Sequence, residues 1–347
     1  MKTEDVGLAS GGITRRAALW GIGTLGQGFV GGVGGVAAAM AWNIITKKED
    51  VVELSDSELI RNVEVVDAQT TLLGDLFDFF GASVHIKPGL GHWDYEGNKP
   101  HPDNMSVAQS YFNVLSSDEK IVAKLVEGPD QPSDFEGSVI LLGDPVSNIL
   151  SRQMLGFDLA PNEDPINPRQ FVHVNDGPFT YPFRLVLCEE DLRQLDNPAA
   201  AQRISENRIN TSIKNTKDSG QLFIPGINAD HYVHDFLLIT VIPNLWDRDS
   251  YFQGKKVVMF SGTHGPGTLA AGLLMQDSKS LLSIWNQVKG LESWQAVVKC
   301  GDLTSWDNET RQRQRPRALI GEPVCLPVEI DRLAAEAHVY SLPVELD

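Results

Sequence analysis

The sequence predicts an α/β fold, a three-layer Rossmann-like domain with a mixed, mostly parallel sheet. Short continuous apolar runs alternate with helical segments in the second half of the chain, and this alternation is typical of parallel strands covered on both faces. Twice, near residues 143 and 262, such a run passes through glycines directly into a helical segment. The composition agrees with a large core, because 42% of the 347 residues are hydrophobic and 22% are charged, as in ordinary globular proteins.

The chain is expected to form three regions, residues 1–46, 47–135 and 136–347. The first is expected to be an export signal or membrane anchor, and the second a linker with a partly helical accessory region. Helices are expected at 67–80, where leucine and phenylalanine recur at helical spacing, and at 106–126, which begins at a capping serine. The glycine-, proline- and histidine-rich stretch 82–102 is expected to be a long loop.

The Rossmann-like domain is expected from residue 136 onward. Its strands are expected at 138–142, 183–188, 236–242, 257–260 and 295–300. Its helices are expected at 147–155, near 268, and at 281–288. Residues 236–242 and 257–260 are also suited to pair as a hairpin, so the sheet is expected to be mixed rather than wholly parallel.

Charge and cysteine content exclude two classes of function. The formal net charge is −17, which argues against binding a nucleic-acid polymer because its phosphate backbone would be repelled. The three cysteines, Cys188, Cys300 and Cys325, form no CxxC pair, so a zinc site built from thiolates is not expected. Buried, unreactive thiols are the favoured interpretation.

The first region has two competing interpretations. Arg15 and Arg16 precede a long uncharged stretch at 17–46, which contains Ala39-Met40-Ala41. This pattern resembles a twin-arginine export signal with a small-x-small cleavage site. The alternative is a retained membrane helix, since the stretch is long enough to span a bilayer and contains glycines at four-residue spacing. A disordered glycine-rich tail is less favoured. The protein is therefore expected to be exported or membrane-anchored, with residues 17–46 meeting the membrane.

The two strand-to-helix turns form the candidate ligand site. In an open α/β sheet, ligands bind at the carboxyl ends of strands whose connections diverge, so both turns would face one crevice if their strands are neighbours. A helix N-terminus there aims unpaired backbone N–H groups at a phosphate or carboxylate. The candidate ligand-binding residues are Gly143, Asp144, Ser147, Asn148, Gly262, Thr263, His264, Gly265, Gly267 and Thr268.

Within this set, hydroxyl and amide side chains would bind the ligand, and the amides of residues 265–268 would hold its anionic group. His264 would act as a hydrogen-bond donor or as an acid–base group. A structural interpretation stays open, in which the glycines permit tight turns and Ser147 and Thr268 only cap helices. Neither turn carries the GK[ST] of a P-loop or a GxGxxG motif.

The order of these motifs resembles that of Rossmann-like nucleotide-sensing domains from poorly characterised bacterial proteins. The motifs are G-D-P-x-S-N after one strand, I-P-N ending a second, and G-T-H-G-P-G-T after a third. This resemblance covers half the chain and implies ligand sensing, without indicating a cofactor. His264-Gly265 is also similar to the HG oxyanion loop of α/β hydrolases, but the GxSxG nucleophile elbow of that fold is missing.

Three further groups of polar residues could bind a metal ion or an anion. Potential metal ligands share one loop, but their spacing matches no standard zinc site: His85, His92, Asp94, His101 and Asp103. His231 and His234 would lie on opposite faces of an extended segment, which disfavours shared metal ligation. Four arginines at alternate positions could form an anion-binding row, although a solvated loop is favoured: Arg311, Arg313, Arg315 and Arg317.

Three functions follow from the sequence. The first is recognition of a small anionic, nucleotide-like ligand by a protein delivered to or across a membrane. The second is an enzyme, a hydrolase or transferase, that uses His264 with Asp144 or Ser147 in the same crevice. The third is a non-catalytic envelope scaffold whose loops are only turns.

Overall fold

The computed structural model describes residues 83–89, 100–116, 122–126, 135–163, 170–207, 212–218, 220–228, 231–305 and 314–342. The predicted export signal or anchor at 1–46 and the predicted helix at 67–80 lie outside these ranges. None of the helices within them has the length and apolar character needed to cross a membrane.

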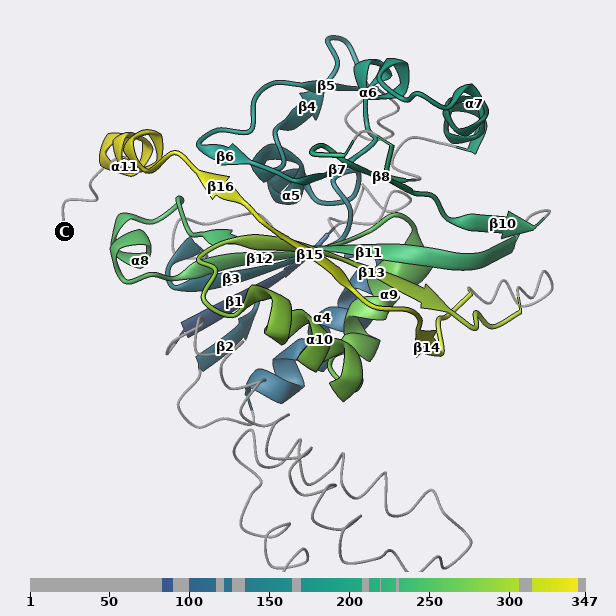
Figure 1. The fold of residues 1–347 in the computed structure, drawn as a ribbon. Coiled ribbons are helices and arrows are strands. Elements are labelled where there is room, and N and C mark those ends of the chain that lie inside the picture. The colour runs from purple at the N-terminus through teal and green to yellow at the C-terminus, as the bar shows by residue number, and fades with distance from the viewer. Residues whose placement is uncertain are drawn as a thin grey trace, which may run out of the picture.

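A nine-stranded sheet runs through the centre of the described structure (Figure 1). Its strands are β1 (Ser83–Pro88), β2 (Val122–Leu125), β3 (Ser138–Leu142), β10 (Gly226–Asn228), β11 (His231–Pro243), β12 (Lys256–Gly262), β13 (Trp294–Gly301), β14 (Ala318–Leu319) and β15 (Val324–Pro327). The main path is β14-β13-β11-β12-β3-β1-β2, with β10 paired to β11 and β15 paired to β13. Strands β2, β1, β3 and β12 are parallel, whereas β11 is antiparallel to both β12 and β13. The expected α/β class with a mixed sheet is confirmed.

Two sequence predictions before residue 136 were wrong. Strand β1 lies in the stretch predicted to be a loop, and it is buried along its length because its Val, His and Ile residues insert between β2 and β3. The predicted helix at 106–126 ends earlier: α4 spans Pro102–Leu115, and Val122–Leu125 forms the edge strand β2. The alternating exposure of β2 suits an edge strand with one face on the core. The central sheet therefore extends N-terminally past the boundary expected near residue 135.

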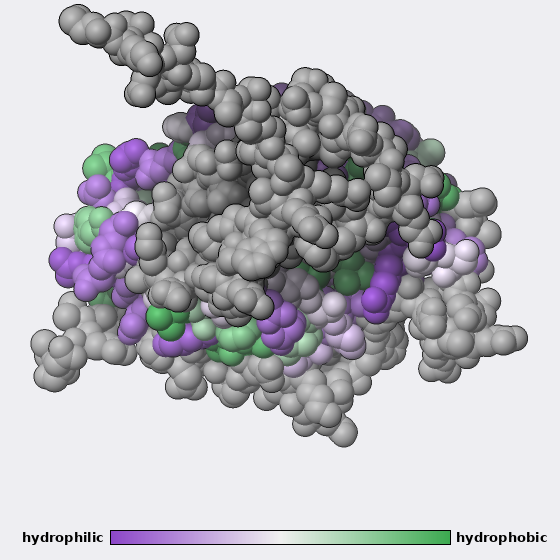
Figure 2. Space-filling view, turned by 90° about the horizontal axis from the view of Figure 1, so that it is seen from below, coloured by the Kyte–Doolittle hydropathy of each residue, from purple (hydrophilic) through white to green (hydrophobic). Residues whose placement is uncertain are grey.

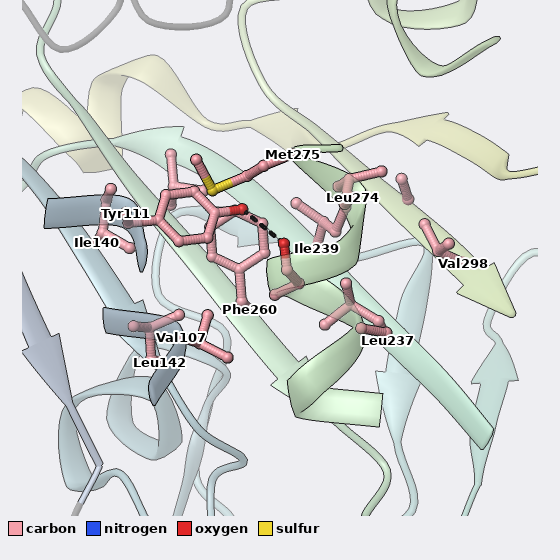
Figure 3. Packing of buried hydrophobic residues seen from close by; sticks show 14 of the residues in the cluster. Val107, Tyr111, Ile140, Leu142, Leu237, Ile239, Phe260, Leu274, Met275 and Val298 are labelled. Atoms are coloured by element: carbon pink, nitrogen blue, oxygen red, sulfur yellow. Dashed lines mark hydrogen bonds between the residues drawn. The ribbon is translucent and has the colours of Figure 1, made fainter. Parts of the chain in front are cut away.

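Three helices cover one face of the sheet: α4, α9 (Gly265–Leu274) and α10 (Ser278–Val288) (Figure 1). Their apolar side chains join those on one face of β3, β11, β12 and β13 in a single cluster, which Figure 3 shows around Tyr111 and Phe260. The Tyr111 hydroxyl donates a hydrogen bond to the Ala271 carbonyl at 3.2 Å, so α4 and α9 are joined by a polar contact inside this core. Seen from this side, the coloured part of the surface mixes hydrophilic and hydrophobic residues (Figure 2).

Short strands and short helices cover the opposite face (Figure 1). Its elements are α5 (Ile149–Met154), β4 (Phe157–Leu159), β5 (Phe171–His173), β6 (Phe179–Thr180), β7 (Phe183–Leu185), α6 (Glu189–Arg193), α7 (Pro198–Asn207), β8 (Ile213–Asn215), β9 (Leu222–Phe223), α8 (Arg248–Phe252), β16 (Glu329–Ile330) and α11 (Arg332–Ser341). Strand β7 occupies the first half of the predicted strand at 183–188. This layer buries Val139 and Leu141, whereas Ile140 and Leu142 face the helices on the other side.

Gln295 joins this layer to the sheet by hydrogen bonds in the core. The residue lies on β13 and is fully buried. Its Oε1 atom accepts from the Phe183 backbone N–H at 2.8 Å, and its Nε2 atom donates to Thr240 Oγ1 at 2.9 Å. Both ends of a buried amide are thereby satisfied.

Candidate functional site

The two predicted turns lie at the same rim of the sheet. Strands β3 and β12 are parallel neighbours, with Leu142 opposite Phe260 at their carboxyl ends. Gly143 N–H donates to the Phe260 carbonyl at 3.1 Å, and Ser261 Oγ donates to the Gly143 carbonyl at 3.3 Å. Helix α5 leaves β3 on one face of the sheet and α9 leaves β12 on the other. The connections thus diverge here, as they do at ligand sites of open α/β sheets.

The polar groups of the first turn bind one another. Asp144 Oδ1 accepts from Ser147 N–H at 2.7 Å. Asn148, and not Ser147, is the N-cap of α5: its Oδ1 accepts from Ser151 N–H at 3.1 Å, and its Nδ2 donates to the Leu142 carbonyl at 3.2 Å. This turn is therefore satisfied internally, which favours the structural interpretation for its amides.

Two glycines of the second turn are required by close packing. A Cβ atom on Gly262 would lie 2.2 Å from Thr268 N, and one on Gly267 would lie 2.1 Å from the Phe236 carbonyl oxygen. Such distances are far inside van der Waals contact, so the start of α9 rests directly on the backbone of β11. These glycines permit the packing of helix on sheet.

Asp235, which was not predicted to be a site residue, completes the first turn of α9. Its carboxylate is fully buried, accepts from Gly267 N–H at 2.7 Å and accepts from the Thr263 hydroxyl. His264 occupies the N-cap position but makes no capping bond with its side chain. The expectation that the amides of residues 265–268 hold an external anion is corrected at two positions. Gly267 N–H is bound by Asp235, and Thr268 N–H donates to the His264 carbonyl.

A sequence signal for this role of Asp235 existed. The residue stands directly before the apolar run 236–242, and the helix after His264 lacks a Ser, Thr, Asp or Asn at its N-cap. A carboxylate at a strand end beside an uncapped helix is the group that would complete such a helix.

His264 is held at one ring nitrogen and unpartnered at the other. Its Nδ1 atom lies 3.3 Å from Asp235 Oδ1. Its Nε2 atom is buried and has no hydrogen-bond partner, and the side chain as a whole is only 11% exposed. An unpartnered buried nitrogen costs about 1–3 kcal/mol of folding free energy. A binding or catalytic role at the rim of the sheet would explain why this nitrogen lacks a partner within the protein.

Three groups lie beside His264 or the residue after it, Gly265. Gly265 N–H, the first in α9, has no acceptor in the described part of the chain. The Asp103 Oδ2 atom, from the start of α4, lies 3.2 Å from the position a Cβ atom would take on Gly265. The Tyr232 ring stacks on the imidazole, with ring centroids 4.3 Å apart and planes at 34°.

Cys300 lies beneath the start of α9, with Sγ 3.6 Å from the Pro266 carbonyl oxygen. Burial raises the pKa of this thiol, and the neighbouring Asp235 carboxylate raises it further. Burial also raises the pKa of Cys325 to about 12. All three cysteines are free thiols, and these shifts keep Cys300 and Cys325 protonated and unreactive near neutral pH.

The other candidate groups do not assemble into a site. His85 is buried in β1 with Nδ1 2.8 Å from the Glu136 carbonyl oxygen, while His92 and Asp94 lie outside the described residues. No cluster of three metal-ligating side chains occurs in the described ranges. Arg315 and Arg317 are both exposed and alternate with buried residues, as expected for an extended segment, and Arg311 and Arg313 lie outside the described ranges.

The structure thus brings the two turns to one rim but directs their side chains differently. Gly143 lies against Asn104, with that amide nitrogen 2.7 Å from a Cβ position on Gly143, whereas Thr263 and His264 bind Asp235 on β11.

No protein-family model, curated protein or solved structure matches this chain.

Proposed function

We propose that the protein binds a small anionic ligand at the rim beside the N-terminus of α9, through His264 Nε2 and Gly265 N–H. The observation that carries the proposal is the buried Nε2 atom without a partner, on the imidazole whose other nitrogen faces Asp235. Buried polar groups in proteins are almost always paired. A ligand atom is the partner that would satisfy this one.

The hydrogen-bonding character of the two groups favours an acceptor-rich ligand. Gly265 N–H is a donor only. His264 donates from Nε2 when it is protonated, since its Nδ1–H then donates to the Asp235 carboxylate. A phosphate or carboxylate oxygen accepts from both.

The carboxylates near this rim limit how the anion binds. Asp235 is compensated by Thr263, Gly267 and His264, and Asp144 accepts from its own turn. Asp103 still places negative charge beside Gly265. A cationic imidazole at His264 would offset this charge and favour an anion at this rim.

A thermal-shift panel on the full-length chain tests this function, using inorganic phosphate, a nucleoside monophosphate and acetate. A ligand at a hundredfold excess over its Kd should stabilise the protein by about 2.7 kcal/mol. This stabilisation depends on the imidazole, because its Nε2 atom is the side-chain partner proposed for the ligand. It should disappear in His264→Ala.

The matched control is His338→Ala, which removes an exposed histidine from α11. Its ligand response should equal that of the wild type. A wild-type protein that no member of the panel stabilises contradicts the proposal and favours a scaffold.

The contact between Asp235 and His264 Nδ1 favours a second candidate function, an enzyme. A carboxylate on Nδ1 orients a neutral imidazole so that Nε2 accepts a proton from a substrate hydroxyl or water. Turnover of a hydroxyl-bearing substrate that His264→Ala abolishes would select this function over ligand sensing.

The Rossmann-like architecture and nucleotide-like ligand expected from the sequence belong to this proposal. They are supported by the parallel order β2-β1-β3-β12 and by the diverging helices α5 and α9.

Delivery of the protein to or across a membrane by residues 1–46 is likewise proposed, from the paired arginines and the uncharged stretch after them. Sequencing the N-terminus of protein from fractionated cells separates its two forms. Cleavage after Ala41 should yield Trp42 as the first residue in an exported fraction. Met1 or Lys2 as the first residue of a membrane fraction would support a retained anchor, and an intact N-terminus in the soluble cytosolic fraction would contradict both.

A further inference from the structure

The Gln314 side chain clamps the backbone of Tyr232. Gln314 is only 8% exposed. Its Oε1 atom accepts from Tyr232 N–H at 2.8 Å, and its Nε2 atom donates to the Tyr232 carbonyl at 3.0 Å and to the Thr304 carbonyl at 3.2 Å. One buried amide therefore holds both backbone groups of the residue that stacks on His264.

The stacked Tyr232 ring complements the contact of His264 with Asp235. A hydrogen bond at Nδ1 opposes rotation about the terminal side-chain torsion, but this bond is long at 3.3 Å and the torsion has a broad energy well. A ring 4.3 Å away across the imidazole face opposes that rotation. The direction of Nε2 is then set by two contacts, one from each side chain.

We infer that Gln314 and Tyr232 are positioning residues for His264, and that the Gln314 clamp sets the affinity of the site without touching the ligand. This inference rests on the proposed function of His264 in binding a small anion. Residues that hold a ligand-binding imidazole in place, without touching the ligand, change its affinity by changing the direction of the binding nitrogen.

The central test compares Gln314→Met with Gln287→Met in the full-length chain. Methionine matches the length of glutamine and removes all its hydrogen bonds. Gln287 is the matched control, because its side chain also binds backbone groups: Oε1 accepts from Cys325 N–H and Nε2 donates to the Pro323 carbonyl. Cys325 lies on β15, which pairs with the N-terminal half of β13. Two readouts are measured: the imidazole resonances of His264 by nuclear magnetic resonance, and calorimetric affinity for inorganic phosphate.

The Gln314→Met variant should shift the His264 resonances and weaken phosphate binding about threefold to tenfold, while Gln287→Met leaves both unchanged. Tyr232→Leu should reproduce the effect, and Tyr232→Phe, which keeps the ring, should not. The Tyr232→Leu/Gln314→Met double variant should be no weaker than the Tyr232→Leu variant, since both changes act through one contact. If Gln314→Met does not fold, the phosphate affinities of Tyr232→Leu and Tyr232→Phe still carry the test.

The readouts separate failure of this inference from failure of the proposed function. His264 resonances that move in both Gln314→Met and Tyr232→Leu support the positioning role. If the wild-type protein also fails to bind phosphate, that failure counts against the proposed function and not against the positioning role. Unchanged resonances in folded Gln314→Met and Tyr232→Leu overturn the inference, even when phosphate binds.

Discussion

Gly267→Ala should destabilise the protein by at least about 3 kcal/mol, or prevent it from folding. The new Cβ atom would lie 2.1 Å from the Phe236 carbonyl oxygen and 3.1 Å from Asp235 Oδ2. The obstacle is backbone on one side, so no side chain can turn away, and α9 must move off the sheet. Overpacking in a rigid core costs 1–3 kcal/mol and occasionally more, and here it also breaks the bond from Gly267 N–H to Asp235.

The matched control lies in the same helix. A Cβ atom on Gly272 would meet only Val107 Cγ2, at 3.9 Å, so Gly272→Ala should stabilise the protein by about 0.5–1 kcal/mol through helix propensity. Urea unfolding of both variants measures the difference. Equal stability of the two alanine variants would show that α9 does not rest on β11 as described.

Asp235→Ala should cost about 3–5 kcal/mol of folding free energy. It leaves the Gly267 N–H unpaired in a buried site, removes one of the two acceptors of the Thr263 hydroxyl, and removes the acceptor facing His264 Nδ1. Each unsatisfied buried group costs about 1–3 kcal/mol, and the substitution removes the acceptors of both the Gly267 N–H and His264 Nδ1.

Asp235→Asn is the informative second variant. Its amide oxygen still accepts from Gly267 N–H, whereas its amide nitrogen cannot accept from His264 or Thr263. In chemical denaturation, the free energy of unfolding of Asp235→Asn should lie between those of the wild type and Asp235→Ala. Asp235→Ala should also lose any ligand response that depends on His264. An Ala variant as stable as the wild type would mean that Asp235 does not complete α9.

The sheet was predictable wherever hydrophobic pattern and turn chemistry agreed. Residues 138–142 form β3 as expected, because a continuous apolar run bounded by glycines suits a strand covered on both faces. The hairpin alternative for 236–242 and 257–260 proved correct, since β11 and β12 are antiparallel. Strand β1 was missed because His85, Lys87 and the flanking prolines read as loop, although His85 and Lys87 are buried between strands.

The candidate site was predictable in its place but not in its bonding. Neighbouring strands with diverging helices put both turns at one rim, as their motifs implied. The partners of His264 come from Asp235 and Tyr232 on β11, and the clamp on Tyr232 comes from Gln314. The contacts of Tyr232 and Gln314 join segments distant in sequence, and spacing along the chain carries no signal for them.

The buried amide of Gln295 bears on why this chain adopts one arrangement. An apolar layer can slide over an apolar sheet at little cost, because dispersion has no direction. The Phe183 N–H is satisfied only when β7 sits at one place over β13, where Gln295 Oε1 accepts from it while Thr240 holds Gln295 Nε2 within the sheet. A slip of β7 by one residue would leave the Phe183 N–H and Gln295 Oε1 unpaired in the core. Gln295 thus favours a single position of β7 over the sheet.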